Sequence, residues 1–117
     1  MAQRMEIETS IEGHIAIVRL EGRLTVGDTP GRLKQATTSA AAQGARVVLL
    51  ELSCVPYIDS TRLGELIAAH ITVTRQGGRF ALVGATSRIT DLLTLAGLED
   101  IFERFESLSA ARSALDA

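Results

Sequence analysis

The sequence predicts an α/β protein in which about four helices cover a small mixed β-sheet. Two β-type segments near the N-terminus flank a glycine turn, which is typical of a hairpin. After them, apolar strand-like runs alternate with amphipathic segments, and this alternation is typical of parallel strands joined by right-handed crossovers. The chain has 117 residues, the length of one domain. We therefore expect a single domain over residues 1–117, with a leading hairpin and parallel strands in one sheet.

The hairpin is predicted over residues 7–11 and 15–20, which are rich in β-branched side chains, with its turn at Glu12-Gly13. The first helix is expected to start at Thr29-Pro30, because threonine caps helices and proline suits the first helical position. It is expected to end at Gly44, a common residue just after a helix.

Residues 47–52 are apolar nearly throughout, which predicts a strand buried on both faces at the centre of the sheet. A helix is predicted to follow from the Asp59-Ser60 junction and to end at Gly77-Gly78. Its inward face is predicted from apolar residues three or four positions apart. These are Leu63, Leu66, Ile67, His70, Ile71 and Thr74.

The remaining elements follow the same logic. Residues 80–83 predict a strand, and a helix capped by Thr86 or Ser87 follows and ends at Gly97. Residues 101–105 predict a short extended or turn segment, after which Ser107 opens a last helix.

Composition narrows the class of function. The net charge is −2 and aromatic residues make up 3%, which argues against a nucleic-acid-binding surface. No apolar run approaches the roughly 20 residues that span a membrane, and residues 1–6 lack the apolar segment of a signal peptide. We expect a cytoplasmic protein without membrane insertion. The one cysteine, Cys54, is expected to be a small buried side chain.

The junction from the central strand into the next helix holds Asp59, Ser60 and Thr61. A helix N-terminus leaves backbone N–H groups without partners and carries a partial positive charge. A hydroxyl at this place either caps the helix or carries a phosphate that these N–H groups stabilise. Both interpretations of Ser60 are open on local chemistry.

Other chemistry finds little support in the sequence. His70 lies ten residues after Ser60 on the same predicted helix, too far along the axis to activate its hydroxyl. The Gly-x-Ser-x-Gly motif of hydrolases is absent, and no His, Cys or carboxylate pair has the spacing of metal ligands. We expect neither an enzyme nor a protein that binds a cofactor or metal.

The motif Asp59-Ser60-Thr61-x-Leu63-Gly64, preceded by Tyr57-Ile58, resembles the phosphorylation signature of the STAS domain family, specifically its single-domain bacterial anti-sigma factor antagonists. The resemblance covers nearly the whole chain. The other segments that carry it are 21–24, Thr29-Pro30-x-x-Leu33, 77–84, and the run from Leu92-Leu93 through Ala96-Gly97-Leu98 to Ile101-Phe102.

The resemblance implies a small mixed sheet with helices mainly on one side, and a regulatory binding protein that is switched off by phosphorylation at Ser60. The implied partners are an anti-sigma factor with serine kinase activity and a serine phosphatase. The implied partner-binding residues are Asp59, Thr61, Arg62, Gly64 and Thr25. The alternative role in the same family is a non-phosphorylated accessory subunit of a membrane transport ATPase, or a scaffold component of a signalling assembly.

Two positions depart from the family pattern. The family usually has glycine where this chain has Arg62, and often has aspartate where it has Thr25. A cation in the first turn of a helix opposes the helix dipole. We expect Arg62 at the surface, either surrounded by water or against an acidic partner surface or a phosphate.

Overall fold

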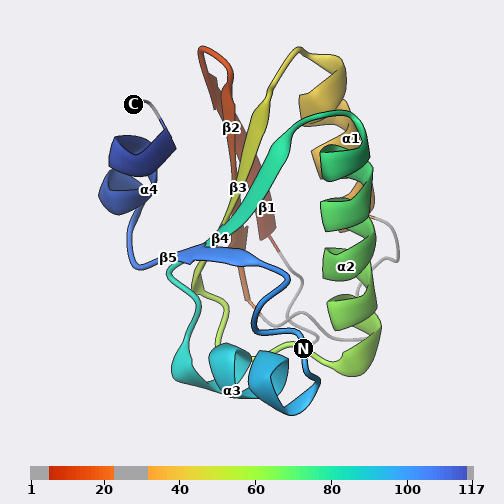
Figure 1. Ribbon diagram of the computed structural model, residues 1–117, viewed down its shortest axis with the longest axis vertical. Coiled ribbons are helices and arrows are strands. Elements are labelled where there is room, and N and C mark those ends of the chain that lie inside the picture. The colour runs from red at the N-terminus through yellow and green to blue at the C-terminus, as the bar shows by residue number, and fades with distance from the viewer. Residues whose placement is uncertain (1–5, 23–31, 116–117) are drawn as a thin grey trace.

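The computed structural model describes residues 6–22 and 32–115. Within them, five strands form one sheet in the order β1-β2-β3-β4-β5, accompanied by four helices (Figure 1). β1 is antiparallel to β2, and the other neighbouring pairs are parallel, which confirms the predicted mixed sheet. The strands are β1 (Glu6–Glu12), β2 (Ile15–Glu21), β3 (Val47–Cys54), β4 (Arg79–Val83) and β5 (Glu103–Phe105), and the helices are α1 (Arg32–Ala42), α2 (Ser60–Arg75), α3 (Ser87–Leu95) and α4 (Leu108–Leu115).

The three inner strands of the sheet, β2, β3 and β4, are largely buried. The central strand β3 contributes Val48 and Leu50 to one core, and Val47 and Leu49 to the other, as its continuous apolar run predicts. Residues of α1, α2 and α3 belong to the first core, and residues of α4 belong to the second. Figure 1 shows α1 and α2 side by side on one side of the sheet and α4 on the opposite side.

The hairpin turn lies one residue later than predicted. Glu12 pairs with Ile15, so the turn residues are Gly13 and His14. Gly13 has a φ of 61°, a conformation that glycine adopts without steric cost. The strand extends through Glu12 because this residue continues the ladder.

The inward face of α2 is only partly as predicted. Leu63 and Leu66 are buried, but Ile71 is 43% exposed and Thr74 is also exposed. The buried row continues instead through Ala69 and Val73. Two neighbouring apolar rows run along this helix, and periodicity alone does not decide which of them packs on α1 and β4.

The last strand, β5, lies at one edge of the sheet. β5, predicted as extended or turn, pairs in parallel with β4. Arg79 donates to both carboxylate oxygens of Glu103, at 3.1 and 2.6 Å, and these hydrogen bonds raise the pKa of Arg79 above its ordinary value.

Thr86, one of the two predicted caps of α3, accepts a hydrogen bond from the Ile89 N–H. The predicted helix start at Thr29-Pro30 lies outside the described residues.

Candidate functional site

The Asp59-Ser60 junction lies where β3 passes into α2, at the edge of the sheet formed by the carboxyl ends of the parallel strands. In parallel α/β sheets this edge commonly carries functional loops. Ile58 is 1% exposed and belongs to the main core, so it anchors the loop immediately before the junction.

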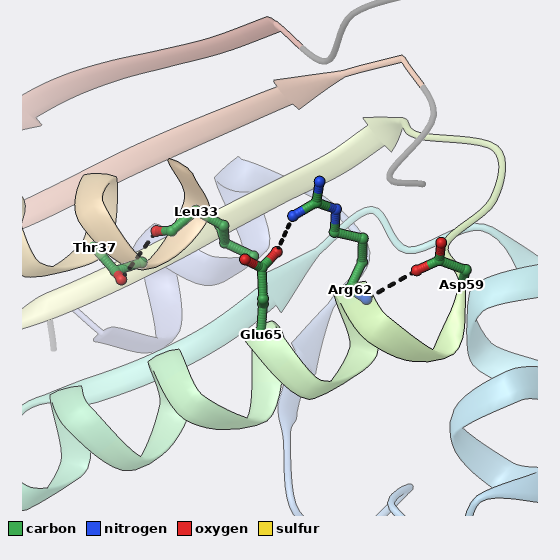
Figure 2. Close-up of polar contacts among 5 residues, drawn as sticks. All are labelled: Leu33, Thr37, Asp59, Arg62 and Glu65. Carbon is green, nitrogen blue, oxygen red and sulfur yellow. Dashed lines mark hydrogen bonds and ion pairs between the residues drawn. The ribbon is translucent and has the colours of Figure 1, made fainter. Parts of the chain in front are cut away.

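Asp59 is the N-cap of α2. Its backbone is extended, with φ −94° and ψ 177°, and its Oδ1 accepts a hydrogen bond of 2.9 Å from the Arg62 N–H (Figure 2). Its carbonyl accepts the first intrahelical bond, from the Leu63 N–H at 2.9 Å. Of the two interpretations of Ser60, the capping role therefore belongs to its neighbour, and Ser60 is the first residue of the helix proper.

Ser60 and Thr61 are both exposed on the first turn of α2. Among the described residues, no hydrogen bond engages the Ser60 hydroxyl. Gly64 lies one turn further on the same side of the helix and is also exposed, and a Cβ placed on it would meet no atom within 4 Å. Gly64 adds no side chain to the surface beside Ser60, so a large partner can approach the hydroxyl closely.

The expectation that Arg62 lies at the surface is wrong. Its side chain is 1% exposed, and its guanidinium contacts the Glu65 carboxylate at 2.5 Å, while the Glu65 side chain is 17% exposed. Figure 2 shows the two side chains meeting beside the start of α2. Arg62 lies on the buried row with Leu63 and Leu66, and a carboxylate one turn away compensates the charge that burial would otherwise penalise.

Glu65 was not among the residues that the sequence singled out. Its spacing of three residues from Arg62 on a predicted helix was a usable signal for an ion pair. The sequence did not show that this pair would be turned inward.

Cys54 and Thr25 are two further residues for which the sequence made a prediction. Cys54 ends β3 and is exposed, so the prediction of a buried cysteine is wrong; the core-facing run of this strand ends at Leu52. Thr25, an expected partner-binding residue, lies outside the described residues.

Within residues 6–22 and 32–115, no three His, Cys, Asp or Glu side chains gather in a way that could hold a metal ion. In the same part of the chain, no helix has the length and apolar character required to cross a membrane.

Asp59→Ala is expected to lower the free energy of unfolding by about 1 kcal/mol, because it removes the acceptor for the Arg62 N–H. Asp59→Ser keeps a capping oxygen and should retain most of that stability. Urea denaturation of the two variants and the wild type measures the difference. Equal losses in both variants would contradict a capping role.

A family model described as the STAS domain matches residues 6–111 of the chain. The chain is 33% identical over 88 residues to the "Anti-sigma-B factor antagonist" of Bacillus subtilis, covering 74% of this chain and 77% of that protein. An anti-sigma factor antagonist from Mycobacterium paratuberculosis has the same fold, with a TM-score of 0.83 at 21% identity and coverage of 97% and 95%. The Bacillus cell fate determinant SpoIIAA in its phosphorylated form also shares it, with a TM-score of 0.70 at 16% identity and coverage of 94% and 99%.

Proposed function

The chain belongs to the STAS domain family, and on this premise we propose that it is an anti-sigma factor antagonist switched by phosphorylation at Ser60. The observation that carries the proposal is the placement of Ser60. Its hydroxyl is exposed on the first turn of α2, and Asp59 already performs the capping that would otherwise occupy it.

In the proposed cycle, the unphosphorylated chain binds an anti-sigma factor through Ser60, Thr61 and Gly64 and the adjoining surface of α2, which frees a sigma factor. Asp59 supports this surface from the cap position. Arg62 supports it from beneath, since its side chain is buried against Glu65. The 33% identical relative is named an anti-sigma-B factor antagonist, and this name favours the antagonist role over the role of a transporter subunit or a scaffold component.

The anti-sigma factor then acts as a serine kinase. The Ser60 Oγ attacks the γ-phosphorus of ATP, an O–P bond forms, ADP leaves, and the hydroxyl proton passes to a base of the kinase. A serine phosphatase hydrolyses the phosphoserine and restores the hydroxyl. In this scheme the chain supplies an acceptor and a surface, works in the cytoplasm, and is not itself a catalyst.

Incubation with ATP and the anti-sigma kinase of the same organism is expected to add one phosphate, and Ser60→Ala should abolish the labelling. Thr61→Ala is the matched control, because it removes the adjacent exposed hydroxyl and should leave labelling intact. Intact-mass and peptide mass spectrometry measure the number and position of phosphates. Labelling that persists in Ser60→Ala would refute the proposed acceptor.

A further inference from the structure

A small pocket of about 240 Å³ lies beside the loop that leads into α2 and Ser60. Part of its wall comes from the two residues that precede Asp59, and the rest from α3. The pocket is lined by Tyr57, Ile58, Arg88, Asp91, Leu92 and Leu95.

The pocket has an unusually exposed apolar edge. Leu95 is 86% exposed and Tyr57 is 41% exposed, while Ile58, at 1%, is fixed in the core. A single exposed leucine needs no explanation. Here the leucine shares one concave surface with an aromatic ring and a half-buried leucine, Leu92, so the apolar exposure is grouped in one place and is not scattered.

One side-chain contact links two of the residues that line the pocket. The guanidinium carbon of Arg88 lies 5.3 Å from the centre of the Tyr57 ring, within the range of a cation–π contact. This contact joins α3 to the loop that precedes Ser60. Arg88 and Asp91 give the apolar pocket a polar rim, which is the usual anatomy of a protein interface. A cavity of about 150 Å³ accepts benzene, so this one has room for a large apolar side chain.

We infer that this pocket receives an apolar side chain of the kinase that phosphorylates Ser60; the inference rests on the proposed function. Ile58 and Ser60 are two residues apart, so their Cα atoms are at most about 7 Å apart. A protein–protein interface of ordinary size covers about 800 Å² of each partner. A kinase that brings the γ-phosphate of ATP to Ser60 therefore extends over the pocket, and Leu95 and Tyr57 are the apolar anchors that it meets there.

The test compares phosphorylation kinetics with the purified anti-sigma kinase that labels Ser60. Leu95→Ser is expected to raise the KM for this chain about tenfold and to leave kcat unchanged, because Leu95 contributes to docking and does not touch the reacting atoms. Ile11→Ser is the matched control. Ile11 is 38% exposed, but it lies on β1 near the Gly13-His14 turn, at the opposite end of the sheet from Ser60.

A benzoylphenylalanine placed at position 95 gives a second readout that needs no turnover. It should form a photo-crosslink to the kinase, whereas the same group at position 11 should not. An unchanged KM in Leu95→Ser, an equal rise in Ile11→Ser, or crosslinks of equal yield from both positions would overturn the pocket's assignment and leave the Ser60 switch standing. Failure of the anti-sigma kinases to label wild-type Ser60 would instead refute the proposed function and the pocket's assignment together.

Discussion

Arg62→Gly is expected to lower the free energy of unfolding by about 3 kcal/mol or more. The substitution removes a guanidinium that is 1% exposed and pairs with Glu65, and it opens space inside the fold. It also introduces the glycine penalty of about 1 kcal/mol in a helix. A surface Arg62 would have predicted only the glycine penalty, so the size of the loss distinguishes the two placements.

Urea denaturation measures this loss, with Arg75→Gly as the matched control. Arg75 ends the same helix and is exposed, so the same substitution there should cost no more than the glycine penalty. The double variant Arg62→Met, Glu65→Leu should recover most of the stability, because apolar side chains of similar volume can replace a buried ion pair. Equal losses for Arg62→Gly and Arg75→Gly would show that the buried pair contributes nothing.

Ser60→Asp is expected to weaken binding to the anti-sigma factor at least about tenfold, or roughly 1.4 kcal/mol, while the thermal transition stays cooperative. The new carboxylate lies beside that of Asp59, which already accepts the Arg62 N–H. The surface around the first turn of α2 thus gains negative charge without losing its cap. A phosphate at Ser60, with a charge of about −2, should have a larger effect in the same direction.

The matched control for this charge is Ser109→Asp. Ser109 is an exposed serine in the first turn of α4, on the other side of the sheet from α2, and the added charge there should not change affinity. Isothermal titration calorimetry at low and high salt measures both variants, and the loss in Ser60→Asp should shrink as salt screens the added charge. Unchanged affinity in Ser60→Asp, or the same loss in Ser109→Asp, would contradict a switch located at Ser60.

The order of elements could be predicted from the sequence because it depends on local signals. Strand-like runs, together with glycines that end the predicted helices, predicted the mixed sheet. The apolar run of β3 predicted a strand buried on both faces. The Asp59-Ser60 junction was predicted between the central strand and the next helix, and it lies at the carboxyl edge of the sheet because a parallel strand that feeds a helix leaves its connecting loop there. The hairpin turn was misplaced by one residue, since a single Gly13 is compatible with more than one register.

The roles within the junction were not determined by local pattern. Asp59 and Ser60 are both good capping residues, and only the backbone conformation at Asp59 decides which of them caps α2. Tyr57 and Arg88 are thirty-one residues apart in sequence, so their contact depends on how α3 packs beside the loop that precedes Ser60.

The sequence by itself determined the mixed α/β sheet, the family, and the position of a hydroxyl at the start of the helix after β3. Only the tertiary structure decided where the buried face of that helix ends and its surface begins. A period of 3.6 residues defines an apolar face, but a charged residue at its edge belongs to that face or to the surface according to its partners. Arg62 is inside, where Glu65 pairs with its charge, and Ser60 remains outside at the surface.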